Sequence, residues 1–451
     1  MTDSLRLTAE EDTGLRGQIT GPVFLRGDRG LEAEVECFNT NAGLPDPEMV
    51  VGAADEQDVC AAVRFAADHR LPVRVQSTGH GPGPCPGDGM IISTGRLNAV
   101  QVDPDSRLAT VGAGCQWRSV VTAGAPFGLA PITGSSVTVG VVGHTLGGGI
   151  GPLIRSHGYS SDWARAFRVV TADGGVVTAD ADSHPDLFWA LRGGKGGFGV
   201  VTEMTLELPY LPALYAGRLV FAGDADIEAA LRAWAGWLPS APPDVSTSVA
   251  LVPAADGQQL HMRFAVPGSA ADGQRRTAAL RAALPAAAVG TLGELPLTEV
   301  HSIHDDPVDP LPLRSFCTEL TGLPDDLVTA LLARVGPGSA APFAEVEIRH
   351  LGGAAAQHVA DAGAVGGRGG ALMLRLVLDD PAAAPVAVAI AADVFADAAP
   401  VRFAQTNVNF SGSMSKRPAF ESAWSPQMRA RLAQVRKTYD PTGLFPFGPA
   451  D

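Results

Sequence analysis

Apolar and polar positions along the first 205 residues follow two alternating periods, one typical of helices and one typical of strands. Apolar side chains recur at helical spacing over three segments, 55–71, 117–129 and 185–194. Apolar and polar residues alternate, as in half-buried strands, over 72–77, 90–103, 107–115, 164–180 and 200–211. We expect the strands of 90–103 and 107–115 to pair, and those of 164–180 to turn at Asp173-Gly174-Gly175.

The character of the chain changes after about residue 210. Alanine-rich helices are predicted over 225–238 and 273–287, between strands over 257–267, 343–353 and 372–380. This pattern predicts helices that cover one face of an antiparallel sheet. The glycine-rich segment 361–370 is expected to be a mobile loop. The last helix, within 425–445, should stop at Asp440-Pro441.

Length and composition narrow the class of protein. A chain of 451 residues with this pattern predicts an α+β protein of two or three domains. The formal net charge of −15 argues against nucleic acid or an anionic membrane as partner, so small molecules are the expected ligands. No stretch approaches the ~20 uninterrupted apolar residues of a membrane span.

The cysteines and the N-terminal residues indicate a cytoplasmic protein. The five cysteines are Cys37, Cys60, Cys85, Cys115 and Cys317. They are widely spaced, odd in number and form no CxxC pair, so we expect reduced thiols that mostly pack in the core. Residues 1–18 are polar and acidic without an apolar centre, and this pattern is not that of a signal peptide.

Three glycine-rich segments lie in the first 200 residues, at 77–83, 140–151 and 193–199. Each could be only a turn, but three together can bring backbone amides around the pyrophosphate of a dinucleotide. Residues 194–199 match G-x-G-x-x-G, yet they follow a predicted helix and precede a strand, the reverse of the Rossmann order. Lys195 makes no P-loop either, because no Ser or Thr follows it in the required frame.

Four segments together carry a specific family pattern: 77–103, 140–151, 169–204 and 435–445. They resemble the berberine-bridge-enzyme-like flavoprotein oxidases, which bind FAD in the fold of vanillyl-alcohol oxidase and p-cresol methylhydroxylase (PCMH). The resemblance implies a PCMH-type FAD-binding domain over 1–205, a substrate-binding domain over 206–400, and a C-terminal segment, 401–451, that returns to the FAD domain.

The resemblance also implies how the flavin is held. In the family, the histidine of the first glycine-rich loop is bonded to the 8α carbon of FAD, and His80 occupies that position; the alternative is that His80 only caps a turn. A cysteine that makes a second bond in many members is replaced by Ser136, so a single covalent attachment is expected. The other residues expected to contact FAD are Arg74, Ser77, Thr78, Gly79, Gly81, Thr138, Gly140, Gly143, His144, Gly148 and Val201.

Catalysis by such an enzyme requires a base that removes a substrate proton. Some relatives use a tyrosine, but this chain has none between 216 and 438. Glu345, Glu347 and Arg349 alternate and should share one strand face, which could look at the flavin or be solvated. We expect Glu347 to be the base, with a pKa raised by burial, and Glu345 and Arg349 to orient the substrate.

The remaining histidines carry no such pattern. His350 should point to the opposite strand face, and His301 and His304 are expected to be surface or packing residues because further metal ligands at suitable spacing are lacking. No metal site is predicted. His261 and His358 belong to no motif that we recognise.

The expected function is oxidation of a small organic substrate: an alcohol, a hemiacetal, a hydroquinone or a natural-product intermediate. The hydride would go to flavin N5 and O₂ would reoxidise the cofactor to give H₂O₂. A role in bacterial secondary metabolism or metabolite resistance is expected by analogy, for a monomer or homodimer. Two alternatives stay open: a flavin-dependent oxygenase or cyclase, and a resistance protein that sequesters a metabolite.

Overall fold

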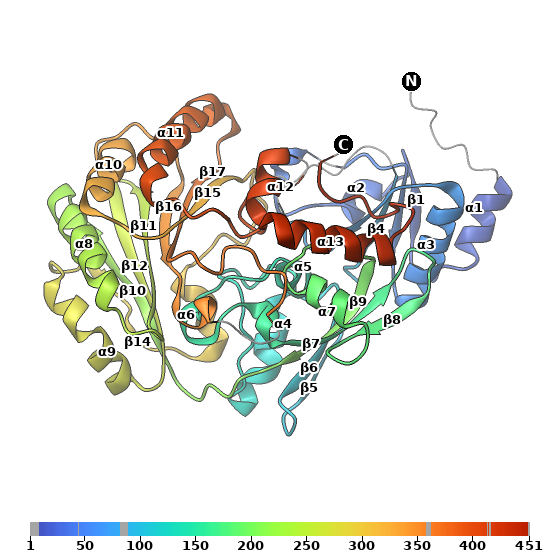
Figure 1. The fold of residues 1–451 in the computed structure, drawn as a ribbon, viewed down its shortest axis with the longest axis horizontal. Coiled ribbons are helices and arrows are strands. Elements are labelled where there is room, and N and C mark those ends of the chain that lie inside the picture. Colours follow the sequence, from blue (N-terminus) through green and yellow to red (C-terminus); the bar gives the residue numbers. More distant parts are fainter. Residues whose placement is uncertain are drawn as a thin grey trace.

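The computed structural model describes residues 9–43, 45–81, 89–357, 362–412, 414 and 416–449. Its strands form three sheets, two of them in the first half of the chain and one in the second (Figure 1). The predicted α+β class is confirmed. Cys85 and His358 lie outside the described residues.

The first sheet has the strand order β1-β2-β4-β3. Its strands are β1 (Val23–Leu25), β2 (Met49–Gly52), β3 (Val73–Gln76) and β4 (Met90–Ser93). The helices of this region are α1 (Ala9–Arg16), α2 (Leu31–Glu34) and α3 (Glu56–His69). Helix α3 begins where the Asp55 side chain accepts a hydrogen bond from the Asp58 amide, and it buries Val59, Cys60 and Val63 in the same core as β2 and β4.

The second sheet is antiparallel, with the order β5-β6-β9-β7-β8. Its strands are β5 (Val100–Asp103), β6 (Leu108–Gly112), β7 (Ala164–Val170), β8 (Val176–Ala179) and β9 (Val200–Glu207). The turn predicted at Asp173-Gly174-Gly175 joins β7 to β8. Around this sheet lie α4 (Trp117–Gly124), α5 (Val141–Leu146), α6 (Ile154–His157) and α7 (Pro185–Leu191).

The expected pairing of 90–103 with 107–115 is only half right. Residues 100–103 pair with 108–112, but 90–93 form the central parallel strand of the first sheet. The four residues of β4 are all buried, as a central strand covered on both faces requires, whereas exposure alternates along β5. The change in pattern within 90–103 therefore marks two strands rather than one.

The third sheet lies in the second half of the chain, with the order β13-β10-β12-β11-β16-β17-β15 and β14 beside β10. Its strands are β10 (Leu214–Ala222), β11 (Ser246–Ala254), β12 (Gly257–Pro267), β13 (Val289–Gly290), β14 (Gly293–Glu294), β15 (Arg314–Leu320), β16 (Glu345–His350) and β17 (Leu372–Leu378). Four helices cover its outer face (Figure 1): α8 (Asp224–Trp237), α9 (Ala270–Ala283), α10 (Asp325–Val335) and α11 (Ala384–Asp397).

The two faces of this sheet differ in chemistry. Met262, Val249 and Ile348 are neighbours across the strands and belong to the core beneath the four helices. One residue along each strand, Arg263, Ser248 and Arg349 are neighbours, so they lie on the opposite face. On that face Ala265 packs with Leu153 of the first half of the chain. The polar face therefore looks toward the first half, and it carries the site described below.

The C-terminal helices α12 (Arg417–Ala423) and α13 (Pro426–Tyr439) lie against the first half of the chain (Figure 1). Leu432 and Val435 are buried in the core of the second sheet, and Arg436 Nε donates to the carbonyl of Gly196 over 2.9 Å. Helix α13 ends at Tyr439, directly before the predicted stop at Asp440-Pro441.

The mobile loop expected at 361–370 is not what the described part of it shows. Ala364 and Val365 are buried, and a Cβ at Gly366 would lie only 1.7 Å from the Ala423 carbonyl oxygen. Arg368 pairs with Asp162. Residues 362–370 pack closely against neighbouring residues, and the glycines permit this close approach because they have no side chain.

Two further features of the structure are the burial of the four described cysteines and the length and hydropathy of the helices. Cys60 and Cys115 are buried, and Cys37 and Cys317 are partly buried free thiols. None of the helices in the described ranges is long and apolar enough to cross a membrane.

Candidate active site

The loop after β3 carries the histidine that the sequence singles out. The amides of Phe38 and Asn39 donate to the carbonyls of Thr78 and Gly79, which fixes the loop against a neighbouring segment. Gly79 has φ +67°, and a Cβ there would lie 2.6 Å from Cys37 Cα. Only glycine fits this position, and its turn directs the chain to His80.

His80 is held from two sides and by a stacked ring. Its Nδ1 lies 2.7 Å from Thr78 Oγ1, and its Nε2 lies 3.2 Å from Thr138 Oγ1. The ring of Phe38 stacks on it, with centroids 3.9 Å apart. Burial lowers the pKa of His80 to about 4, so the imidazole is neutral at pH 7. A neutral imidazole has a lone pair available for bond formation.

Helix α5 brings the second glycine-rich segment beside this loop. The Gly140 amide, at the start of the helix, donates to Thr78 Oγ1 over 3.3 Å. His144 follows one turn later, and its pKa is lowered to about 3 by burial and by the charge of Lys195. Ser136 Oγ lies 2.9 Å from Thr138 Oγ1, which in turn contacts His80. Ser136, expected to replace the family cysteine, is thus connected to His80 through the Thr138 hydroxyl group.

Lys195 and Asn409 also belong to this region. Lys195 Nζ donates to the Gly143 carbonyl and to Asn409 Oδ1, both over 2.7 Å, and Asn409 Nδ2 donates to the His144 carbonyl over 2.9 Å. Burial lowers the pKa of Lys195 to about 8. The sequence analysis did not name these two as site residues. Lys195 had a signal, a lone cation inside a glycine run; Asn409 had none.

These residues fit an FAD molecule. A Cβ built on Gly81 or Gly143 would meet no atom of the described residues within 4 Å, apart from those adjacent along the chain or in the same helix, so both glycines border open space in this part of the structure. Ser77 Oγ is buried and has no hydrogen-bond partner among the described residues. Open space beside glycine backbone and an unpartnered hydroxyl are what a bound phosphate or flavin would use.

The other residues expected to touch FAD have mixed placements. Gly148 has φ +99°, and a Cβ there would lie 3.1 Å from Asn407 Nδ2. Arg74 lies in β3, and Val201 lies in β9 within the core of the second sheet. The structure thus brings Thr78, His80, Thr138 and Gly140 into direct contact, but gives Val201 a packing role.

Glu345, Glu347 and Arg349 share one face of β16, as their alternation predicts. Arg349 Nη2 donates to Glu347 Oε2 over 2.9 Å. Arg263 of β12 donates to Glu345 over 2.7 Å and to Glu347 over 3.2 Å. The face is not solvated, because Glu347 is fully buried and both arginines are 3% exposed.

The expected rise in the pKa of Glu347 is wrong. Burial alone would raise it, but the charges of Arg349 and Arg263 and a contact with His304 outweigh burial and hold the pKa well below its usual range. An ionised carboxylate between two guanidinium groups is a weak proton acceptor. Glu347 therefore fits a positioning role better than the role of base.

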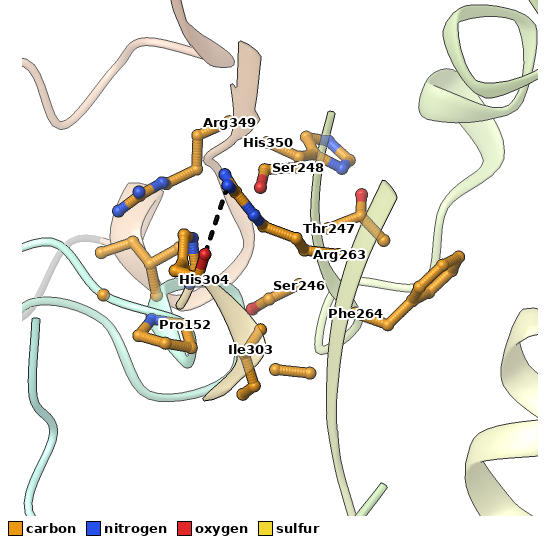
Figure 2. Close-up of a pocket in the computed structure, with 13 residues that line it drawn as sticks. Pro152, Ser246, Thr247, Ser248, Arg263, Phe264, Ile303, His304, Arg349 and His350 are labelled. Carbon is orange, nitrogen blue, oxygen red and sulfur yellow. Dashed lines mark hydrogen bonds between the residues drawn. The ribbon is translucent and has the colours of Figure 1, made fainter. Parts of the chain in front are cut away.

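A small cavity adjoins this cluster (Figure 2). Its walls come from α6 and the residues before it, from β11, β12 and β16, and from the segment around Ile303. The polar residues in its lining are Ser246, Thr247, Ser248, Arg263, His304, Arg349 and His350. Arg349 lines the cavity, whereas Glu345 and Glu347 do not.

His304 is buried, which agrees with the packing alternative of its expected role, and it also lies at the cavity. Its side chain is 4% exposed, its Nε2 lies 3.4 Å from Glu347 Oε1, and it lines the cavity. Figure 2 shows it beside Arg263, whose Nη2 donates to the His304 carbonyl over 3.4 Å. His301 is exposed as expected, with 41% of its side chain accessible. Sequence gave no signal for His304, since it follows the 3-10 helix Leu297–Ile303, which has no periodic pattern.

His261 lies on the polar face of β12, and burial lowers its pKa to about 4. His350 points away from Glu347 and Arg349, as expected, and its Nε2 lies 2.9 Å from Arg155 Nη1. In the parts of the chain that the structure describes, no group of three or more metal-ligating side chains could hold a metal ion.

Asp306 connects the two clusters. Its carboxylate accepts a hydrogen bond from Ser135, the neighbour of Ser136. Burial raises the pKa of Asp306, but its neighbours His304, Ser135 and Arg263 lower it overall. Its charge also acts on His80. Asp306 therefore lies close enough to act electrostatically on both His80 and His304.

Comparison with known proteins indicates which domain carries the His80 loop. Residues 47–180 match the family model described as an FAD binding domain. This part of the chain is an FAD-binding domain. The matched segment includes the His80 loop, Thr138 and helix α5.

Curated relatives carry the same domain. The chain is 38% identical over 227 residues to the FAD-linked oxidoreductase pgmH of Aspergillus terreus, covering 49% of this chain and 46% of that one. It is 36% identical over 207 residues to (R)-6-hydroxynicotine oxidase of Paenarthrobacter nicotinovorans, covering 45% of each. The chain thus matches these relatives over about half of their length.

The whole fold matches a solved oxidase. The crystal structure of 6-hydroxy-D-nicotine oxidase from Arthrobacter nicotinovorans superposes with a TM-score of 0.84, over 98% of each chain, at 22% identity. The fold of the chain is therefore that of this solved oxidase, and the match of residues 47–180 to an FAD binding domain agrees with the resemblance of the sequence.

Proposed function

We propose that this protein is an FAD-dependent oxidase of a small organic substrate. The observation that carries the proposal is the juxtaposition of a flavin-type loop at His80 with a buried polar cavity at His304, joined through Asp306. The FAD-binding domain, the names of the relatives and the oxidase fold support it. The substrate class is an alcohol, a hemiacetal, a hydroquinone or a natural-product intermediate, with O₂ as the final acceptor.

FAD is held covalently, through His80 alone, in this proposal. The neutral ring, the fixed orientation given by Thr78, Thr138 and Phe38, and the adjoining open space support the bond. Ser136 has no thiol to form a second one. When bound, FAD supplies the two-electron acceptor for a substrate C–H bond. Lys195, beside the same glycine segment, adds a cation close to the cofactor.

The test is anaerobic bleaching of the flavin. Purified holoprotein is mixed without O₂ with a panel of alcohols, reduced quinones and polyketides, and absorbance of the oxidised flavin is followed. The proposal predicts loss of the yellow colour with at least one class, and one H₂O₂ per substrate oxidised after air is admitted. Turnover without peroxide favours an oxygenase or cyclase, and tight binding without bleaching favours a sequestering protein; either result contradicts the oxidase.

The cellular role completes the proposal. A cytoplasmic enzyme of bacterial secondary metabolism or metabolite resistance, acting as a monomer or homodimer, agrees with the acidic chain and its free thiols. Expression and size-exclusion measurements of the holoprotein test these statements separately from its chemistry.

A further inference from the structure

We propose that the cavity beside His304 and Arg349 binds a hydroxyl group of the substrate, and that His304 accepts the proton of this hydroxyl. The inference rests on the proposed oxidase function and names its substrate chemistry. It assigns a catalytic role to a residue that the sequence analysis treats as packing.

Unpartnered polar atoms gather around this cavity. Ser248 Oγ, Arg263 Nε, Arg349 Nη1 and both ring nitrogens of His304 are buried and have no hydrogen-bond partner among the described residues. All four residues line the cavity and are at most 6% exposed. Buried polar groups are normally paired, and each unpaired one costs about 1–3 kcal/mol. His304 Nε2 faces Glu347, so four of these atoms, all on residues that line one cavity, indicate a ligand that supplies the missing partners.

The charges around the cavity favour a neutral ligand group. Three guanidinium groups and three carboxylates interact there: Arg263, Arg349, Arg375, Glu345, Glu347 and Asp306. These six charges cancel. His304 adds none at pH 7, since burial and the charge of Arg349 lower its pKa. A carboxylate ligand would upset this balance, whereas a hydroxyl group accepts and donates hydrogen bonds without adding charge.

Glu347 selects the tautomer of His304. Its ionised oxygen lies 3.4 Å from Nε2, so the proton of the neutral ring is favoured on that nitrogen. The lone pair is then on Nδ1, which has no other partner. This is the arrangement of a carboxylate, an imidazole and a hydroxyl in which the imidazole accepts the proton and the carboxylate stays ionised.

The proton step balances as follows. The substrate O–H bond breaks and an N–H bond forms at His304 Nδ1, while the hydroxyl-bearing carbon loses its hydrogen with two electrons to the bound flavin and becomes a carbonyl. Arg349 Nη1 donates to the substrate oxygen and stabilises negative charge that develops on it. Glu347 stabilises the imidazolium that results.

Binding of three small probes to the flavin-loaded protein tests the site without turnover. Benzyl alcohol, benzoate and toluene share a ring and differ in the group on it, and calorimetry at pH 8 measures their affinities. We expect benzyl alcohol to bind at least tenfold more tightly than the other two. Tighter binding of benzoate, equal binding of toluene, or no binding of benzyl alcohol would overturn the hydroxyl site.

Variants assign the contact to His304. His304→Gln and Ser248→Ala should each weaken benzyl alcohol binding several-fold, while His301→Gln, an exposed histidine three residues away, should leave it unchanged. Ser248→Ala removes only one hydroxyl group, so it is informative even where His304→Gln folds poorly. Arg349 is left in place because its removal would leave the buried carboxylate of Glu347 without this ion-pair partner. Unchanged affinity in both site variants would contradict the proposal.

The pH dependence tests the proton role. Protonation of His304 removes its lone pair, so benzyl alcohol affinity should be constant from pH 8 to 6.5, fall at lower pH, and become flat in His304→Gln. A wild-type profile that His304→Gln does not change would exclude the role. Flavin that no compound reduces, in protein that binds benzyl alcohol as expected, would instead contradict the oxidase and leave the hydroxyl site standing.

Discussion

The ring of His80 stacks on the ring of Phe38, with planes 8° apart and centroids separated by 3.9 Å. Together with Thr78 and Thr138, this contact fixes the imidazole in the plane and direction that it needs for bonding to a flavin. The proposed attachment of FAD would therefore depend on a residue 42 positions away in sequence, which the glycine-rich motif does not include.

Phe38→Leu should slow covalent attachment of FAD about fivefold. A stacked pair contributes about 1 kcal/mol, and leucine cannot form the stack that orients the imidazole. The measurement is the rate at which acid-stable flavin appears when apoprotein is mixed with FAD. Phe65→Leu removes a similar stack, on His69 in helix α3, and serves as control. Equal slowing in both variants would assign the effect to stability instead.

Folding stability should fall as pH drops from about 6.5 toward 4. Arg155 Nη1 lies 2.9 Å from His350 Nε2, and burial together with the Arg155 charge lowers the pKa of His350 to about 3. The unfolded chain protonates this histidine near pH 6.5 and the folded one does not, so protons favour unfolding in that window. His350→Gln should remove on the order of 1–3 kcal/mol of the pH dependence measured by urea unfolding.

The opposite pH dependence is expected from Glu319. It is fully buried, its Oε1 accepts only from the Asn407 amide, and burial raises its pKa well above the usual range. Above pH 4.5 the unfolded carboxyl loses its proton while the folded one keeps it, so this group makes the protein less stable as pH rises.

Glu319→Gln should therefore raise the melting temperature at pH 8 by a few degrees, and change it little at pH 4. Glutamine keeps an acceptor for Asn407 and stays neutral at both pH values. Thermal unfolding of the two proteins side by side is the measurement. A variant that is less stable at pH 8 than at pH 4, relative to wild type, would show that Glu319 is ionised in the folded protein.

Glu347→Gln should slow flavin reduction by on the order of tenfold to a hundredfold without removing the ionisation that controls it. The glutamine can still contact His304, but it no longer stabilises an imidazolium or balances Arg349 and Arg263. Glu345→Gln, which leaves the pair between Glu347 and Arg349 intact, is the matched control. A pH profile that loses its basic group only in Glu347→Gln would restore Glu347 as the base.

Much of the fold could be predicted from the sequence because period reports burial. Helices α8, α9 and α13 lie where helical spacing predicts them, and the turn at Asp173-Gly174-Gly175 joins the strands that it was expected to join. The sequence predicted that all of 90–103 pairs with 107–115, but its two ends belong to different sheets. Sheet membership depends on long-range pairing that local pattern does not encode. The glycines of 362–370 indicated mobility, but glycine permits close packing equally well.

The candidate site could likewise be predicted from the sequence only in part. The loop at His80 could be found because a single histidine among glycines and prolines is an unusual local sequence. The alternation of Glu345, Glu347 and Arg349 correctly placed them on one face. It could not indicate that Arg263 also lowers the pKa of Glu347, since Arg263 comes from another strand. His304 and Asn409 could not be found, because only tertiary structure brings their irregular segments to the site.

The most direct test of the central claim is the mass of the denatured protein and of its proteolytic peptides. Wild-type holoprotein should retain its yellow colour in acid and be heavier than the polypeptide by one FAD, with the added mass on the peptide that contains His80. His80→Ala should show the polypeptide mass alone. Wild-type protein that releases all of its flavin on denaturation, or carries it on another residue, would contradict the account.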